Sequence, residues 1–455
     1  MPIKKEEVGL RVLDHDSAIQ TDIDDGLGNE VEKALAGEML PPIGILIFTL
    51  LLPLLVALVL KLRRAGRHLP PGPCPLPLIG NLWTLKFQLH HETLAQLAET
   101  YGTIYTVWLG KTPVVVLNGF QAVKEAFICH SEELSDRPAS PLLRAVMGNK
   151  GIIFSNGHVW RQQQRFGLMT LRKLGLGTKG LEVRIQDEAN HLLQYLREEK
   201  GHPLEPACRL ANSMANVICA VTFGHRFSTE DVVFRQLITT VDLLMSTRQK
   251  TCSRVYDLFP WLMRHLPGPH QQMFHDWQVL RTFIVQEIRN HQRNVTDEPQ
   301  DLIDFYLEQI SATREDTTST YDEENLIEVV ADIFIAGTEA PTTTLHWALL
   351  YMMMYPDIQE NVQKELDAIV GRTQAIQYED RKRLPYTNTV IHEIQRYANI
   401  VPIGPMRQCT TKITLQNMPI DKATVFVSGS SWRGWSSSSS STICCGPSIS
   451  GHRRE

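Results

Sequence analysis

A small polar patch interrupts one of the most apolar stretches of the chain. The patch is Ala336–Ala340, and it lies in the segment 332–355, whose apolar residues fall on nearly every side of a predicted helix. Such a helix is expected to be buried, where an unpaired carboxylate such as Glu339 is costly. Pro341 also removes a backbone donor inside the helix. Two interpretations stay open: a kinked core helix whose Glu339 finds a partner, or a helix that passes over a cofactor and leaves room for a small ligand.

Two further pairs of residues have spacings that suit a site. In the predicted helix His158–Leu171, Trp160 and Arg165 place an indole and a cation on neighbouring faces. Glu393 and Arg396 are three residues apart in a predicted helix and can pair on one face. The alternative for this second pair is an ordinary surface ion pair, which contributes little stability.

Cysteine is the remaining residue type that could carry chemistry here. The chain has eight cysteines without a C-x-x-C pair, so we expect free thiols in a cytosolic body. Cys409 follows the helix of Glu393 in a predicted strand region, and Cys444 and Cys445 lie in the segment ICCGPS. These three are the weak candidates for a metal ligand.

The elements that must position these residues are mostly helices. Helical periodicity covers most of the segment 158–293, and a β-hairpin is predicted over 104–117 with its turn at Gly110. Short strands are predicted over Val401–Phe426. We therefore expect residues 82–427 to form one mainly α body with a small β region.

Three segments are expected to shape an apolar pocket within this body. They are the loop Glu132–Asn156, which looks polar and irregular, the helical residues Phe234–Met245, and the strand entry Val401–Met406. Such a lining suits a lipophilic substrate. The apolar loop 259–269 is expected either to pack in the core or to dip into a bilayer surface.

The N-terminal part predicts attachment to a membrane. Residues 1–40 carry ten carboxylates against four basic side chains and are expected to be a flexible acidic extension. Residues 41–60 form an uncharged segment that is long enough for one transmembrane helix. A cleaved signal peptide fits this segment less well. The basic and Pro-rich hinge 61–81 follows, so the positive-inside rule leaves the body cytosolic. The net charge of −5 gives no reason to expect a nucleic-acid partner.

Four blocks, in order, resemble the membrane-bound cytochromes P-450, the haem-thiolate monooxygenases. They are the hinge PPGPCPLPLIGN, the Trp160 segment HVWRQQQRFGLMTLRKLGLG, the long helix AGTEAPTTTLHWALLYMMMYP and the segment LPYTNTVIHEIQR. The resemblance covers roughly Pro70–Val427. It is nearest to the mammalian microsomal branch that oxidises drugs and fatty acids, in particular its arachidonate-epoxygenase group.

The resemblance implies the cytochrome P-450 fold with haem in its core. Ala336, Gly337 and Glu339 would then lie over the distal face, where oxygen binds, together with Ala340, which stands in the usual Thr position. A cysteine thiolate would hold the iron, and its electron donation would help to cleave the O–O bond.

Other roles also follow from the resemblance. Trp160 and Arg165 would lie near a haem propionate, and Glu393 and Arg396 would lock the proximal core. Electrons would come from NADPH through the cytochrome P-450 reductase, with cytochrome b5 as a second possible partner. The protein would sit in the endoplasmic reticulum membrane by a single N-terminal anchor and insert oxygen into fatty acids such as arachidonate and into lipophilic xenobiotics.

Three departures from the family pattern bear on activity. Ala340 lacks the hydroxyl that relays protons, and Gln164 occupies the position of an Arg, one residue from Arg165. The loop Phe-x-x-Gly-x-Arg-x-Cys-x-Gly that supplies the iron ligand has no clear counterpart. Phe426 opens such a loop, but its Cys position is Arg433, a cation that cannot replace a thiolate.

The segment 428–455 differs in composition from the rest of the chain. It contains six consecutive serines after two tryptophans and is expected to be disordered. One hypothesis is a deletion or mis-spliced exon followed by the wrong reading frame, which predicts a P-450 fold truncated at its C-terminus and a catalytically inactive variant. The alternative is a natural Ser-rich tail.

Overall fold

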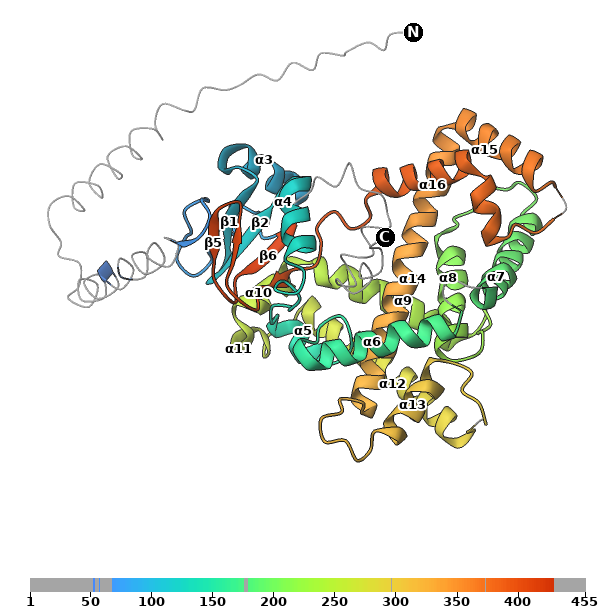
Figure 1. Ribbon diagram of the computed structural model, residues 1–455, viewed down its shortest axis with the longest axis horizontal. Helices are drawn as coiled ribbons and strands as arrows, with labels where there is room; N and C mark the ends of the chain where they lie inside the picture. Colours follow the sequence, from blue (N-terminus) through green and yellow to red (C-terminus); the bar gives the residue numbers. More distant parts are fainter. Residues whose placement is uncertain are drawn as a thin grey trace, which may run out of the picture. The chain divides into compact units, whose positions relative to one another are not determined.

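Helices make up most of the described part of the chain. The computed structural model describes residues 52–53, 57, 68–175, 179–295, 297–372 and 374–428. The chain divides into the units Met1–Arg64 and Ala65–Glu455, and the labelled elements of Figure 1 belong to the second. The predicted anchor 41–60 lies almost wholly outside the described residues, as do the acidic extension 1–40 and Cys444 and Cys445. Among the described residues, no helix is long and apolar enough to span a bilayer.

The helical elements follow one another with short connections. In chain order they are α3 (His91–Tyr101), α4 (Phe120–Lys124), the π-helix η2 (Glu125–Cys129), α5 (Pro141–Met147), α6 (Gly157–Lys173), α7 (Lys179–Glu198), α8 (Ala207–Thr222), α9 (Val232–Gln249), α10 (Thr251–Leu258), α11 (Pro260–Met263), α12 (Pro269–Arg293), α13 (Leu302–Ala312), α14 (Glu323–Met354), α15 (Pro356–Ile369), the 3-10 helix η3 (Tyr378–Arg383) and α16 (Pro385–Ala398).

The β region is a small mixed sheet. Strands β1 (Ile104–Leu109) and β2 (Thr112–Leu117) form the predicted antiparallel hairpin, in which Gly110 supplies a positive φ of 62° at the turn. Strand β6 (Val425–Ser428) pairs parallel to β2, and β3 (Arg407–Gln408) completes the order β1-β2-β6-β3. The strands β4 (Ile413–Leu415) and β5 (Met418–Ile420) form a separate hairpin. The prediction of short strands over Val401–Phe426 is thus confirmed.

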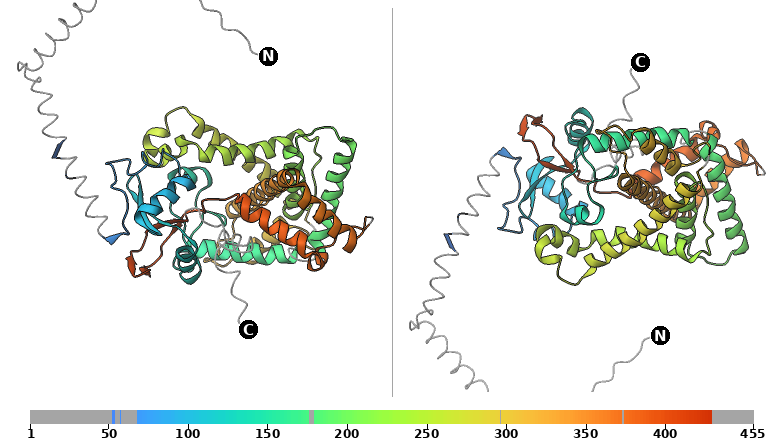
Figure 2. Two further views of the ribbon diagram at one scale, coloured as in Figure 1. Left: turned by 90° about the horizontal axis from the view of Figure 1, so that it is seen from above. Right: turned by 90° about the horizontal axis from the view of Figure 1, so that it is seen from below.

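The largest core lies between the helices. It is built mainly from α8, α9, α12, α13 and the first half of α14, and Figure 1 shows α14 running between α8 and α6. Helices α9 and α12 pack along each other (Figure 2). Phe334, Leu280 and Tyr306 are fully buried there. A mainly α body with a small β region, as predicted, positions the candidate site residues on α14, α6 and α16.

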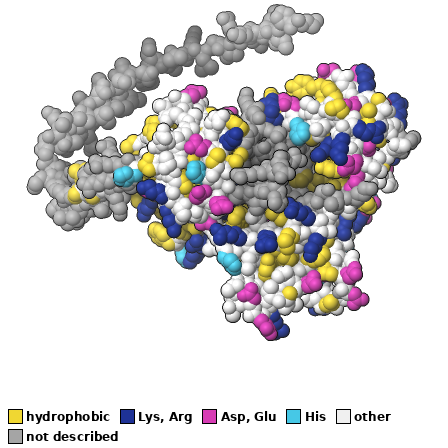
Figure 3. All heavy atoms as spheres, in the orientation of Figure 1, with side chains coloured by type: hydrophobic (Ala, Val, Ile, Leu, Met, Phe, Trp, Pro, Cys, Tyr) yellow, Lys and Arg dark blue, Asp and Glu magenta, His cyan; other side chains and the backbone are white. Residues whose placement is uncertain are grey.

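The expectation that the apolar helix 332–355 is buried along its length is wrong for most residues beyond Ile335, although Thr338 and Tyr351 are buried. Helix α14 is continuous, but its second half extends past the helices that cover its first half and contacts mainly α15 and α16. Apolar side chains remain at the surface near the junction of α14 and α15 (Figure 3). The exposed apolar residues of α14 are Leu345, Trp347, Leu349, Leu350, Met353 and Met354.

The loop Glu132–Asn156 is more regular than its composition indicated. It contains α5, which begins with Pro141 at its first position. Ser140 caps this helix, because its hydroxyl accepts a hydrogen bond from the Leu143 amide at 3.3 Å. The sequence SPLL therefore encodes a helix start that the expectation of an irregular loop missed.

Candidate functional site

The polar patch of α14 lies where this helix meets α8. Gly337 is needed for the contact, because a Cβ there would come within 2.5 Å of the Ile218 side chain. Thr338 is buried, and its hydroxyl has no hydrogen-bond partner among the described residues. The helix continues through Pro341, and the hydroxyl of Thr342 donates to the Thr338 carbonyl at 2.7 Å. Small and polar residues therefore serve a close helix contact here.

Glu339 is the acidic residue of this patch, and its carboxyl has a raised pKa. It is half-buried, and no described Lys or Arg forms an ion pair with it. Burial raises the pKa of its carboxyl, and the neighbouring Asp242 raises it further. Ala336 is exposed and Ala340 is half-buried. The partner expected for Glu339 in a kinked core helix is thus missing among the described residues, and the carboxyl is biased toward its protonated form.

A second pair of carboxyl groups lies deeper in the first half of α14. Glu328 and Asp332 are one turn apart and both are buried. Burial and the charge of Asp332 raise the pKa of Glu328 to about 9. Burial raises the pKa of Asp332 to about 7, against two amide hydrogen bonds from Ile152 and Ile153 at 2.7 and 2.9 Å. Glu328 therefore holds a proton at neutral pH.

Sequence reasoning missed this pair, although a signal was present. Two acidic residues at positions i and i+4 inside an otherwise apolar helix must share a buried face. Gly151 marks the other side of the contact, because its φ is +76° and a Cβ there would lie 2.5 Å from the Asp332 carboxylate. The pair thus ties the loop before α6 to the centre of the fold.

Helix α6 places Gln164, which stands in the family's Arg position, and the cation Arg165 on different faces. Gln164 is buried, with 6% of its surface exposed, while Arg165 is exposed. Trp160 is half-buried. A shift of one residue rotates a side chain by about 100° around a helix, and this rotation puts Arg165 on the outer face.

Arg137 is a buried cation that sequence reasoning did not identify. Its guanidinium donates to the carbonyls of Ile153 and Met406, both at 3.2 Å, and its amide donates to the Asn156 side chain at 2.7 Å. Only 8% of its surface is exposed. It also opposes the rise in the pKa of Asp332. The only sequence signal is its place in the polar segment SDRPASP.

Glu393 and Arg396 form the ion pair that their spacing allows. Two hydrogen bonds of 2.7 and 2.6 Å join the guanidinium to the carboxylate, and this bonding lowers the pKa of Glu393. Their side chains are 56% and 31% exposed. Glu365 joins the same helix to α15 by accepting from the amides of Tyr386 and Thr387. The pair is present, and its role in a cofactor site stays a prediction.

Two of the described cysteines, Cys409 and Cys219, are buried thiols. Cys409 is buried, its thiol donates to the Thr411 carbonyl at 2.7 Å, and burial raises its pKa. Cys219 is buried in the α8 core, where burial and the charges of Glu287 and Glu188 raise its pKa. A thiol with a raised pKa is the protonated form, which is a poor metal ligand. Neither residue is thus prepared to ligate iron.

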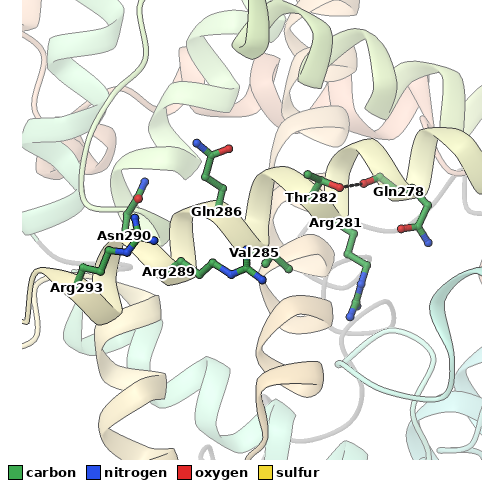
Figure 4. Close-up of a pocket in the computed structure, with 8 residues that line it drawn as sticks. All are labelled: Gln278, Arg281, Thr282, Val285, Gln286, Arg289, Asn290 and Arg293. Carbon is green, nitrogen blue, oxygen red and sulfur yellow. Dashed lines mark hydrogen bonds between the residues drawn. The ribbon is translucent and has the colours of Figure 1, made fainter.

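A groove of about 430 Å³ runs along α12 (Figure 4). Its labelled side chains come from this helix alone and are mostly polar, with Val285 among the arginines Arg281, Arg289 and Arg293. None of the three segments expected to shape an apolar pocket lines it. Of the segment Phe234–Met245, Phe234 and Val241 pack into the helical core instead.

Comparison with known proteins extends over nearly all of the described residues. The sequence profile of the family named "Cytochrome P450" matches residues 70–432. Cytochrome P450 2J2 of Homo sapiens is 41% identical over 376 residues, which are 82% of this chain and 74% of the relative. Cytochrome P450 2J5 of Mus musculus is 40% identical over 365 residues, 80% of this chain and 73% of the relative. Cytochrome P450 2C14 of Oryctolagus cuniculus is 37% identical over 384 residues, which are 84% of this chain and 78% of the relative. Every candidate site residue except Cys444 and Cys445 lies within the profile match.

Proposed function

Because this chain belongs to the cytochrome P450 family, we propose that it is a membrane-bound haem monooxygenase of the microsomal branch. It hydroxylates or epoxidises fatty acids such as arachidonate and lipophilic xenobiotics. It uses O2 and electrons from NADPH, delivered by the cytochrome P-450 reductase, with cytochrome b5 as a second donor. The observation that carries this proposal is the identity of about 40% with 2J and 2C relatives over four fifths of the chain.

Haem is the cofactor of this family, but the described residues do not supply its ligand. An iron that activates oxygen in this way needs a cysteine thiolate. Cys409 and Cys219 are buried thiols with raised pKa values, and the other described cysteines are Cys74, Cys129, Cys208 and Cys252, of which three are exposed. Of the three weak candidates for the ligand, Cys444 and Cys445 lie outside the described residues. No step of oxygen chemistry is assigned to the described residues.

We assign the α14 patch to proton handling and close packing. Burial and the charge of Asp242 raise the pKa of Glu339, which has no cationic partner among the described residues, so its carboxyl is the proton-holding group of the patch. Gly337 allows the approach of α8, and Ala336 leaves the helix surface open. Ala340 cannot relay a proton, and a water would have to take that role.

The membrane placement has support within the described residues. Leu78 and Trp83 of the hinge region are exposed, and Trp261 of α11 is 70% exposed. Gly110 lies between these segments, because a Cβ added there would meet both the side chain of Leu258, which ends α10, and the Leu78 carbonyl. Exposed apolar side chains of this kind suit contact with an endoplasmic reticulum bilayer surface, with the body in the cytosol.

A second candidate function is a non-catalytic, membrane-anchored relative. Two observations favour it: the inward-bonded thiol of Cys409, and the exposed apolar residues in the second half of α14. A P450 core that encloses a cofactor would keep such residues out of water. In this case the chain shares descent and fold with its relatives without their chemistry.

The reduced, carbon-monoxide difference spectrum of membranes that contain the chain separates the two candidates. The monooxygenase hypothesis expects a red-shifted, thiolate-type Soret band that C444S or C445S abolishes and C409S retains. The C409S variant is the matched control, because it removes a thiol that is already bonded inside the fold. Absence of the band, with the protein detected in the same membranes, contradicts the monooxygenase hypothesis and supports the non-catalytic relative.

A further inference from the structure

We propose that His291, Asp301 and Asp304 form a binding site for one divalent transition-metal ion of the zinc class, at the junction of α12 and α13. The site is separate from the α14 patch and does not depend on the proposed function. Each of the three side chains offers one ligand atom, and these atoms all lie within 4.8 Å of one another.

The imidazole of His291 is held in the orientation that a metal ligand needs. Its Nδ1 donates to the backbone carbonyl of Glu287 at 2.7 Å, which leaves Nε2 to face the carboxylates. Metal-binding histidines commonly bond one ring nitrogen to a carbonyl in this manner, because the bond fixes the tautomer and the ring plane. The Nε2 atom lies 2.8 Å from Oδ2 of Asp301.

Asp301 divides its two oxygens between structure and ligation. Its Oδ1 caps α13 by accepting from the Asp304 amide at 3.0 Å, so that Oδ2 alone is directed at His291. The His291 and Asp301 side chains are only 12% and 3% exposed. Asp304 is half-buried and gives solvent access to the third position. The local chain thus fixes one imidazole nitrogen and one carboxylate oxygen in a nearly dry place.

The charge of the cluster suits a cation. Without an ion, both ring nitrogens of His291 face acceptor oxygens, so the imidazole is protonated and the cluster carries one net negative charge. Among the described residues no Lys or Arg forms a salt bridge with Asp301. The cluster lies between the last turn of α12, where the helix dipole favours positive charge, and the first turn of α13, where it favours the two carboxylates. The ion would replace the proton between Nε2 and Oδ2 and release it to solvent. Two ligands of a tetrahedral zinc are about 3.3 Å apart, so the contact need widen by only about 0.5 Å.

A second cluster in the chain has similar ligand atoms but is more exposed, and one of its carboxylates is already paired with an arginine. Asp187, Glu188 and His191 of α7 also bring their ligand atoms within 4.8 Å of one another. Glu188, however, is already paired with Arg226 at 2.7 Å. The side chains of His191 and Asp187 are 48% and 60% exposed. This cluster provides a matched control.

One imidazole with two carboxylates selects for the borderline metals rather than for magnesium. Imidazole suits zinc and its neighbours, whereas Mg²⁺ prefers an octahedral shell of oxygens and keeps its water. We therefore expect Zn²⁺ to bind and Mg²⁺ at millimolar concentration not to displace it.

The test measures zinc bound to the full chain in detergent by equilibrium dialysis after treatment with a chelator. The variants are D304N, H291Q and the control H191Q. D304N is the mildest change, because an Asn carbonyl can still accept the hydrogen bond that the Gln300 amide gives to Asp304. All variants are compared at the same free Zn²⁺ concentration, so that zinc held by the eight cysteines cancels in the differences.

The expected result is that the wild type and H191Q hold one equivalent of Zn²⁺ more than D304N and H291Q. Zinc should also raise the melting temperature of the wild type and of H191Q more than that of D304N. Equal zinc content in the wild type and D304N, with D304N shown to be folded by circular dichroism, would overturn the proposal and leave an ion pair only. Displacement of the extra equivalent by Mg²⁺ would overturn the assigned metal class.

Discussion

Replacing Glu328 by Gln should make the free energy of unfolding less dependent on pH. Glu328 is 4% exposed on α14, and burial with the charge of Asp332 raises its pKa to about 9. In the unfolded chain the same carboxyl has the ordinary value of 4.5. The folded state therefore binds one proton more than the unfolded state between these two values. The stabilisation is complete below pH 4.5 and is lost as the pH rises toward 9.

The size of the effect follows from the linkage relation. One proton corresponds to a slope of about 1.4 kcal/mol per pH unit inside the window. Between pH 6 and pH 8 the wild type should thus lose about 2.7 kcal/mol through Glu328. Gln has nearly the shape of the protonated carboxyl and does not titrate, so E328Q should lose none of this amount. Asp332 lies beside Glu328 and contributes with the same sign, so the difference between the two proteins reports the coupled pair of carboxyl groups.

The assay is thermal unfolding of the full chain in one detergent at pH 6 and pH 8, followed by circular dichroism. With an unfolding entropy of about 2.1 cal/mol/K per residue, roughly 360 folded residues convert 2.7 kcal/mol into about 3.5 °C. E324Q is the matched control, because Arg281 pairs with both Glu328 at 4.0 Å and Glu324 at 2.6 Å, but the Glu324 side chain is 54% exposed. If E328Q loses as much between the two pH values as the wild type, Glu328 does not hold its proton and the reasoning fails.

Two further predictions concern packing. Tyr306→Phe removes the hydroxyl that donates to the Gln163 side chain at 2.7 Å in a fully buried place, and should cost about 1–3 kcal/mol in urea unfolding. An unchanged midpoint would show that Gln163 finds another donor. Gly337→Ala forces a Cβ against Ile218 and should cost about 1–3 kcal/mol, whereas Gly148→Ala meets no atom within 4 Å but has a φ of +72°, so its cost is backbone strain alone. Equal melting temperatures for G337A and the wild type would show that α8 yields without cost.

The local elements were predictable because their signals are local. The hairpin 104–117 follows from alternating β-branched residues around a glycine, and its strands have the predicted bounds. The pair Glu393 and Arg396 follows from helical spacing alone. Family resemblance added the fold, because four blocks in order carry more information than any one of them.

What the sequence did not predict depends on contacts between distant segments. Apolar periodicity cannot tell whether a neighbour covers a helix, so the exposure of α14 beyond Ile335 was missed. The raised pKa of Glu328 and the buried Arg137 likewise arise from chain segments far apart in sequence. The site at His291 escaped notice because its ligands come from two helices whose packing no short motif records.

The exposed apolar residues of α14 also have a calorimetric consequence. Heat capacity rises on unfolding mainly because apolar groups become hydrated. Trp347, Leu349 and Met353 are already 37%, 40% and 69% exposed in the folded chain, so each adds less to this rise than a fully buried residue would. The heat-capacity change of unfolding per residue should therefore fall below the usual value of about 12–15 cal/mol/K. A smaller heat-capacity change flattens the curve of stability against temperature, so the chain should melt over a broad range and resist cold better than a fully enclosed fold of the same length.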